Sequence, residues 1–400
     1  MKIERICDLY LKAVANVGYN ESTIRNYRGV IRRFKKFCNN HGVREYSCDI
    51  GKLYADDVIS GKTGKFSSTR YYTQGRFVRL LDSYFLTGEF DFAIAKKGRI
   101  LPTNQKHKEI YKKYQNYLHS TYDNANTVHF YEYGMYCVLE FLNKLKIYNL
   151  SNIQSHIVIK YISQTKITRQ RGVLCELRGI FRYLNRDDLL IAIAGIHAPR
   201  IKRIIPILTE NELKKIKELI TECQISRRDA AIVTIGLSYG IRACDLINLK
   251  LSDINWKNET ISFKQSKTGN IVYLPLITSI GNVIARYIIE ERPNVNSNVL
   301  FLRSIAPYTP LTDHASCYAV VKKVLQKAGI KKDSRIWGMN FLRHNAASTM
   351  VKKEIPIETI AAILGHSTPD TTDVYITTDV KILKECVLPM RNISVVESNL

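Results

Sequence analysis

The amino-acid sequence predicts a mainly α-helical, multidomain chain with one small antiparallel sheet in its last part. Apolar and aromatic residues recur at helical spacing through most of the 400 residues. Two polar, basic stretches interrupt this pattern, at 96–108 and 197–206, and such stretches are typical of linkers. In the last part, two short alternating runs separated by turn residues predict a β-hairpin. We therefore expect three units, at residues 1–95, 106–195 and 205–390.

The charge balance predicts a polyanionic partner. The chain has 60 lysines and arginines against 36 aspartates and glutamates, a net charge of +24, and its pI is about 9.6. Lysines also solvate helices, but an excess this large repels itself unless a partner neutralises it. Nucleic acid is therefore the favoured partner before any motif is considered.

Composition also bears on location and metals. The apolar runs are shorter than a membrane span, and the first residues are charged, without the apolar core of a signal peptide. We expect a cytoplasmic protein, without a membrane partner, that associates with the nucleoid when bound to DNA. The nine cysteines are scattered and lack a C-x-x-C pair, which favours reduced thiols over disulfides or a zinc site.

The first unit contains a strongly amphipathic helix. Asn20 to Thr23 forms a break and cap, and apolar residues then recur to Phe37 at helical spacing. A basic face of this kind is often simple solvation, and contact with DNA phosphates is an equal alternative here because aromatic residues are interleaved. The candidate DNA-binding residues are Arg25, Arg28, Arg32, Arg33, Lys35 and Lys36.

The second unit is predicted to repeat the plan of the first. Three residues recur 104 positions later, with Thr23, Tyr27 and Phe37 matched by Thr127, Tyr131 and Phe141. Further on, Ile59-Ser60 recurs as Ile162-Ser163, 103 positions later. Each unit then ends in a helix rich in aromatic residues. The shared identities are few, so we treat the duplication as a hypothesis.

The third unit begins with clear helix signals. Thr209 to Glu212 has the spacing of a capping box for a helix over 213–220. An apolar helix is predicted over 229–239, ended by Gly240, and a second helix follows over 241–249.

Three further elements follow in the third unit. The alternating runs 260–264 and 271–276 predict a hairpin with Lys267 at its tip. A helix is expected over 340–351, and Ile360 to Leu364 forms the apolar face of another, stopped by Gly365. Turn residues at 369–372 then precede a helix that would carry Tyr375.

Over about residues 205–390 the chain resembles the tyrosine recombinase (phage integrase) family. Gly240-Ile-Arg242-Ala-Cys-Asp245 is similar to the family's first arginine box. The segment from Lys267 to Leu276 is similar to its hairpin lysine with the closing Pro-Leu. Phe341-Leu-Arg343-His344, Leu364-Gly-His366 and Tyr375 are like its third block, with 23 residues from Arg343 to His366 and 9 more to Tyr375.

The resemblance implies a role for each matched residue. Phosphodiester cleavage builds negative charge on two non-bridging oxygens, which Arg242 and Arg343 would hold through paired donors. Tyr375 would be the nucleophile, Lys267 would protonate the leaving 5′ oxygen, and His366 would donate a hydrogen bond to the phosphate. The alternative for Arg242 is a structural ion pair with Asp245, and the two readings are compatible.

One position departs from the family pattern. The family usually has histidine three residues before the second arginine, where this chain has Asn340. Asparagine donates a hydrogen bond but exchanges no proton near neutral pH. His344, one helical turn later, is a candidate substitute, although packing or capping is its commoner use.

The resemblance also implies a fold, a reaction and partners. Two SAM-like helical units would precede a mixed α/β catalytic domain of the tyrosine recombinase fold, and the adjoining domains would close on duplex DNA as a C-shaped clamp. The first unit would be an arm-binding or duplicated core-binding unit. The reaction would be site-specific integration or recombination for a mobile element, without metal or other cofactor. A homo-tetramer would act on two DNA sites, with accessory DNA-bending or directionality proteins. A DNA-binding regulator that has lost catalysis and a type IB topoisomerase-like enzyme remain alternatives.

Overall fold

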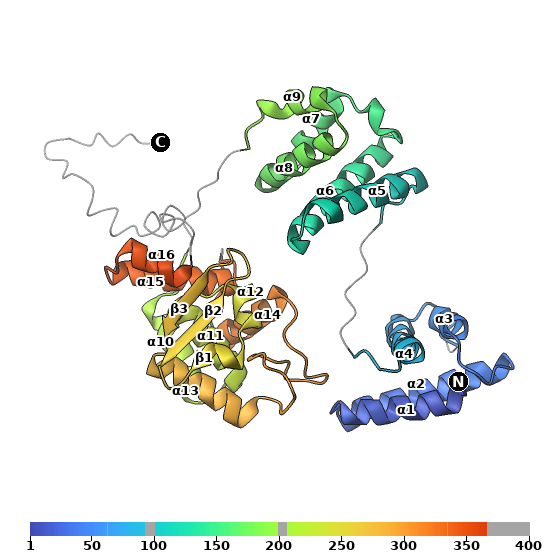
Figure 1. The fold of residues 1–400 in the computed structure, drawn as a ribbon, viewed down its shortest axis with the longest axis horizontal. Helices are drawn as coiled ribbons and strands as arrows, with labels where there is room; N and C mark the ends of the chain where they lie inside the picture. The colour runs from blue at the N-terminus through green and yellow to red at the C-terminus, as the bar shows by residue number, and fades with distance from the viewer. Residues whose placement is uncertain (62, 93–100, 199–205, 334, 366–400) are drawn as a thin grey trace, which may run out of the picture. The chain divides into compact units, whose positions relative to one another are not determined.

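The computed structural model describes residues 1–61, 63–92, 101–198, 206–333 and 335–365 (Figure 1). Within these ranges the chain is mainly helical and has one three-stranded antiparallel sheet in its last part, which confirms the predicted fold class. None of the helices in these ranges is long and apolar enough to cross a membrane. The predicted helix around Tyr375 lies outside the described residues.

Residues 1–92 form four helices around an aromatic core. Asn20 accepts a hydrogen bond from the backbone N–H of Thr23 at 2.9 Å, so the predicted cap is confirmed. Tyr10, Phe34 and Phe77 are fully buried and pack edge to face in pairs. The helices are α1 Ile3–Asn16, α2 Glu21–Asn40, α3 Cys48–Asp56 and α4 Ser68–Thr87.

Residues 101–198 form five α-helices and one 3₁₀ turn around a second core. The predicted linker to residue 108 is too long, because Asn104 caps a helix that starts at Gln105. The elements are α5 Gln105–Thr121, α6 Ala125–Lys144, η1 Leu150–Asn152, α7 Ser155–Ser163, α8 Ile167–Tyr183 and α9 Asp187–Ala194.

The two helical segments share part of their plan. The helices α2 and α6 have 20 residues each, and both start at an asparagine N-cap. The proposed match of Ile59-Ser60 with Ile162-Ser163 is wrong, because Ile59 makes an isolated β-bridge with Phe66 whereas Ile162 lies in α7. The similarity between the segments is therefore one of helices rather than of every residue.

Residues 206–365 contain the sheet and a larger core. The strands pair in the order β1-β2-β3, with Phe263 opposite Val272 in the predicted hairpin. The helices are α10 Glu210–Thr221, α11 Arg227–Tyr239, α12 Ala243–Asn248, α13 Thr278–Arg286, α14 His314–Lys327, α15 Met339–Lys352 and α16 Ile357–Leu364. The strands and short turns are η2 Leu251–Asp253, β1 Ile254–Asn255, β2 Thr260–Lys264, β3 Ile271–Pro275 and the π-helical η3 Tyr287–Glu291.

The helix α11 is the centre of this core. It packs against α13, α14 and α15, and eight of its thirteen residues are buried. The predicted capping box is present at the start of α10, where Thr209 and Glu212 exchange hydrogen bonds of 2.9 and 3.2 Å. A small apolar cluster that includes Met350 and Ile360 joins α15 to α16. The helix α15 therefore packs against both α11 and α16.

Candidate active site

Two glycines bring the candidate residues together. Gly240 ends α11 with φ of 63°, and a Cβ at this position would lie 2.9 Å from Leu364 and 3.2 Å from Arg343. Gly365 ends α16 with φ of 63°, and a Cβ there would lie 2.1 Å from Gln265. Only glycine accepts both this backbone conformation and this crowding. The chain can therefore turn sharply at two places against one buried polar cluster.

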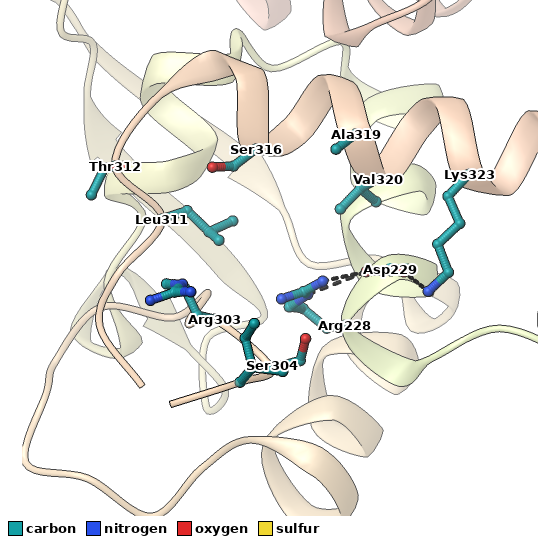
Figure 2. A pocket seen from close by; sticks show the side chains of 11 residues that line it. Arg228, Asp229, Arg303, Ser304, Leu311, Thr312, Ser316, Ala319, Val320 and Lys323 are labelled. Atoms are coloured by element: carbon teal, nitrogen blue, oxygen red, sulfur yellow. Dashed lines mark hydrogen bonds and ion pairs between the residues drawn. The ribbon is translucent and has the colours of Figure 1, made fainter. Parts of the chain in front are cut away.

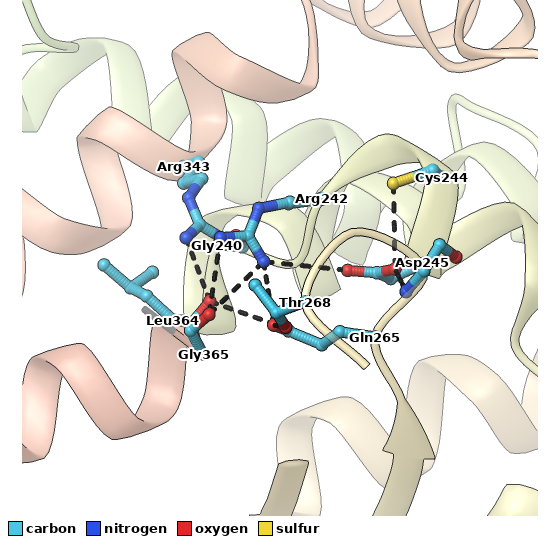
Figure 3. A network of polar contacts seen from close by, with 10 residues as sticks. Gly240, Arg242, Cys244, Asp245, Gln265, Thr268, Arg343, Leu364 and Gly365 are labelled. Carbon is cyan, nitrogen blue, oxygen red and sulfur yellow. Dashed lines mark hydrogen bonds and ion pairs between the residues drawn. The ribbon is translucent and has the colours of Figure 1, made fainter. Parts of the chain in front are cut away.

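Arg343 lies on α15 with 6% of its surface exposed. Its Nη1 donates to the carbonyl of Gly240 at 2.8 Å, and its Nη2 donates to the carbonyl of Leu364 at 2.9 Å (Figure 3). Each contact satisfies a carbonyl that the end of a helix leaves without an intrahelical partner. Arg343 therefore joins the C-terminal ends of α11 and α16.

Arg242 precedes α12 and reaches the same place from the other side (Figure 3). Its Nη1 donates to Oε1 of Gln265 at 2.9 Å, and its two Nη atoms lie 3.5 and 3.4 Å from the carbonyl oxygen of Gly365. Asp245 is 4.0 Å away, an ion pair without a short hydrogen bond. Both candidate arginines thus contact the backbone carbonyls at the end of α16, so the two guanidinium groups lie close together.

Asp245 is buried and anchors the hairpin as well as facing Arg242. Its Oδ1 accepts from the backbone N–H of Ser266 at 2.7 Å. The thiol of Cys244 also lies 3.7 Å from this oxygen, and burial together with the Asp245 charge raises the pKa of Cys244. The predicted supporting role of Asp245 therefore has two structural partners, an arginine and the hairpin.

Lys267 lies in the turn between β2 and β3, as predicted, and is exposed. The turn is closed by a backbone hydrogen bond of 2.8 Å from Gln265 to Asn270 and by one of 3.0 Å from Gly269 to Gln265. The structure thus holds the base of the hairpin beside Arg242 and leaves the lysine side chain in solvent.

Asn340 and His344 lie on the same helix as Arg343 but differ in environment. Asn340 is exposed in the first turn of α15, where an amide can reach a ligand. His344 is half-buried, and burial followed by the Arg343 charge lowers its pKa. Both effects favour the neutral imidazole over the charged form. The predicted His366 and Tyr375 lie outside the described residues.

Gln265 is the site residue that sequence reasoning missed. Its side chain is 3% exposed and contacts Arg242, Thr268 and Leu364. A signal was available, because Ile261 and Phe263 alternate with exposed or half-buried residues along β2 and the same alternation places Gln265 on the buried face.

The predicted basic face on α2 is present. Five of its six candidates are exposed and Lys35 is half-buried, while Tyr27, Val30 and Phe34 on the opposite side are buried. Arg28 pairs with Glu21 at 3.1 Å, so part of this charge is balanced within the helix.

A separate cavity of about 260 Å³ lies beside the start of α11 and along α14, where Ser316, Val320 and Lys323 line it (Figure 2). Three charged side chains of its lining pair with one another. The buried Asp229 accepts from Arg228 and from Lys323, each at 2.9 Å. Such a pair of bridges is the usual way to satisfy a buried carboxylate, so we assign this cluster to the packing of α11.

Comparison with known proteins agrees with this geometry. A model described as the phage integrase family matches residues 206–381. The chain is 33% identical over 149 residues to the putative integrase/recombinase y4gC of Sinorhizobium fredii. The matched stretch covers 37% of this chain and 76% of that protein. It is 29% identical over 218 residues to the tyrosine recombinase XerA of Pyrococcus furiosus, covering 54% and 73% of the two chains. Two further putative integrase/recombinases of S. fredii are matched over 55% and 57% of their length.

The fold is also shared with solved structures. A crystal structure of a lambda integrase tetramer bound to a Holliday junction matches 79% of this chain and 90% of that chain, with a TM-score of 0.53 and 16% identity. At this identity the likeness concerns the fold alone.

Proposed function

We propose, because the chain belongs to the phage integrase family of tyrosine-type site-specific recombinases, that it cleaves and rejoins duplex DNA through a 3′-phosphotyrosyl intermediate. The observation that carries this proposal is that the two arginines donate to neighbouring carbonyls. Arg343 and Arg242 donate to the carbonyls of Leu364 and Gly365, the last residues before His366 in the sequence. Guanidinium groups this close together suit a single phosphate.

The arginines would bind the scissile phosphate. A phosphate oxygen is a charged acceptor and forms a stronger hydrogen bond with a guanidinium than a peptide carbonyl does. The carbonyls that now accept from Arg242 and Arg343 orient both side chains before DNA arrives. Preorganised donors of this kind stabilise the extra negative charge of the transition state without reorganising during the reaction.

The bonds made and broken follow from the nucleophile. The hydroxyl of Tyr375 would lose its proton to a base or to water, and its oxygen would attack phosphorus. The bond to the 5′ oxygen would break as Lys267 delivers a proton to that oxygen. His366 and Asn340 would donate hydrogen bonds to the phosphate. The phosphotyrosyl bond conserves the energy of the phosphodiester, so rejoining by a 5′ hydroxyl needs no nucleotide.

The proposal extends to assembly. The three expected domains would be an N-terminal helical unit at 1–95, a core-binding domain at 106–195 and a catalytic domain at 205–390, the last two closing around duplex DNA. Four copies would exchange strands between two sites through a Holliday junction, the kind of DNA to which the lambda integrase tetramer is bound in its crystal structure. Accessory DNA-bending or directionality proteins, and action on cytoplasmic DNA, belong to the same proposal.

The chemistry is tested by covalent trapping. On a nicked copy of its site, the wild-type chain should become joined to a DNA 3′ phosphate that survives denaturation. Tyr375→Phe should abolish the adduct and keep DNA binding, because only the hydroxyl is lost. Tyr273→Phe is the matched control, since Tyr273 is 73% exposed on β3 and takes no part in the proposed chemistry. An adduct that persists in Tyr375→Phe would overturn the nucleophile assignment.

The same assay separates the alternatives. Binding without any adduct in the wild-type chain would support a DNA-binding regulator, the reading that Asn340 favours. Relaxation of supercoiled DNA that lacks the site would support a type IB topoisomerase-like activity.

A further inference from the structure

We propose that Gln265 is a positioning residue that sets the Lys267 hairpin against Arg242 and the end of α16. The inference rests on the proposed function. Three hydrogen bonds of one buried amide carry it. Its Oε1 accepts from Arg242 at 2.9 Å and from Thr268 at 2.8 Å, while its Nε2 donates to the carbonyl of Leu364 at 3.2 Å (Figure 3).

Each bond leads to a different part of the candidate site. Arg242 is the first phosphate-binding arginine, and Thr268 follows Lys267 in the turn. The carbonyl of Leu364 also accepts from Arg343 at 2.9 Å, so the amide and the second arginine share one acceptor. Gln265 is therefore the point where the hairpin, both arginines and the segment leading to His366 are linked.

The chemistry of this position requires an amide. Oε1 must accept from two donors, and Nε2 must donate to a carbonyl that lies within reach. A carboxylate would keep the first two contacts and lose the third, and a thioether would lose all three. The reverse orientation of the amide would set its NH₂ group against the Arg242 guanidinium and its oxygen against the Leu364 carbonyl, so these two partners fix the orientation.

Packing holds the amide in place. Gln265 is 3% exposed, and a Cβ added to Gly365 would lie 2.1 to 2.4 Å from its amide atoms. The backbone of Gln265 also closes the hairpin through Asn270 and Gly269, at 2.8 and 3.0 Å. A change in the side chain is therefore transmitted to the turn that carries Lys267, rather than being absorbed by movement of the amide.

The role is testable by changing the leaving group. In a 5′-bridging phosphorothiolate DNA site, sulfur replaces the 5′ oxygen and leaves without protonation, because a thiol is far more acidic than an alcohol. Single-turnover cleavage is measured on oxygen and sulfur substrates for the wild-type chain and each variant. Lys267→Ala calibrates the assay, with a loss of about 100-fold or more on oxygen and recovery on sulfur.

The variants of the amide network are distinguished by how their loss of rate on the oxygen substrate compares with their loss on the sulfur substrate. Thr268→Val removes only the hydrogen bond between Thr268 and Gln265. Its cleavage rate should fall about 10-fold on the oxygen substrate and little on the sulfur substrate. Gln265→Met should lose rate on both substrates, because Arg242 is also released, with a loss on oxygen about 10-fold larger than on sulfur. Gln265→Glu keeps the contacts to Arg242 and Thr268, and should lower both rates equally.

Thermal unfolding of each variant is measured in parallel. If Gln265→Met does not fold, Thr268→Val still tests the role, because Thr268 is half-buried in the turn and its replacement disturbs the core less. Equal losses on the two substrates for both Thr268→Val and Gln265→Met, or no loss for either, would overturn the positioning role. A wild-type chain that cleaves neither substrate would instead reject the proposed function itself.

Discussion

The Nη2 atom of Arg343 lies 2.9 Å from the carbonyl oxygen of Leu364, so a buried cation on α15 is held by the last turn of α16. Two neutral carbonyls, those of Gly240 and Leu364, accept from this guanidinium. Neutral acceptors of this kind orient the charge without cancelling it. The contact also ties the position of Arg343 to the segment that continues toward His366 and Tyr375.

Gly240→Ala should therefore disturb both stability and cleavage. The left-handed conformation costs alanine about 1–2 kcal/mol, and crowding against Leu364 and Arg343 adds roughly 1–3 kcal/mol. Urea unfolding measures the stability, and covalent trapping measures the rate. Gly329→Ala is the matched control, because φ is 68° and, apart from the adjoining residues, no described atom lies within 4 Å of an added Cβ. Equal destabilisation by the two variants would show that glycine is needed at position 240 only for its left-handed backbone conformation and not to avoid crowding.

The ion pair between Glu212 and Arg335 predicts a pH-dependent part of the stability. Burial opposes ionisation of Glu212, but N–H donation from Thr209 and the Arg335 guanidinium outweigh it and lower its pKa. A lowered folded pKa stabilises the fold above the unfolded pKa of about 4.3, and this contribution is lost as the pH falls through the folded pKa. Glu212→Gln should lose about 1–3 kcal/mol at pH 7, because it breaks hydrogen bonds to a charged group.

Denaturant unfolding at pH 7 and pH 3 checks this prediction. The difference in unfolding free energy between the wild-type chain and Glu212→Gln should be smaller at pH 3. Glu218→Gln, at an exposed position on the same helix, is the control. A difference that stays constant with pH would mean that the capping geometry rather than the charge stabilises α10.

The basic face of α2 predicts salt-dependent DNA binding. Log affinity should fall with log salt with a slope of several units, because each phosphate contact releases condensed counterions. Replacing the exposed Arg32 and Arg33 by glutamine should lower that slope by about 1 for each phosphate that is no longer neutralised. Lys257→Gln, in an exposed turn after β1, is the control. An unchanged slope would mean that the face of α2 is only solvated.

Much of the fold could be predicted because its signals are local. A few neighbouring residues determine each of the features that were predicted correctly. These are the asparagine cap of α2, the capping box of α10, the glycines after α11 and α16, and the hairpin. The match of Ile59-Ser60 with Ile162-Ser163 failed because two shared residues do not determine whether a segment is helical or bridged. A single identity carries less information than a cap or a period.

The candidate site was predicted less completely than the fold, for a physical reason. The residue types of Arg242 and Arg343 signal phosphate chemistry, but their present acceptors include the backbone carbonyls of Leu364 and Gly365. A carbonyl is common to every residue, so the sequence cannot mark which one is used. Gln265 could have been predicted to be buried, because the alternation along β2 extends to it, but two of its partners, Arg242 and Leu364, come from distant segments.

Asn340→His is the sharpest test of how the nucleophile is activated. Asn340 is exposed three residues before Arg343, where a histidine would face solvent and titrate near its ordinary pKa of about 6.5. If proton exchange at this position limits cleavage, the variant should react faster above that pH and lose the gain below it, because only neutral imidazole accepts a proton. Single-turnover rates over a pH range of about 5.5 to 8.5, which brackets that pKa, measure the profile.

His344 does not obscure this test, because it is present in the wild-type chain and in each variant, so its own titration is common to all the profiles compared. Asn340→Gln is the control, since it keeps an amide and adds no titration. A flat profile with unchanged rate in Asn340→His would show that hydrogen bonding from the asparagine amide suffices. The activating base for Tyr375 would then have to come from another group or from water, and the departure of this chain from its family would carry no catalytic cost.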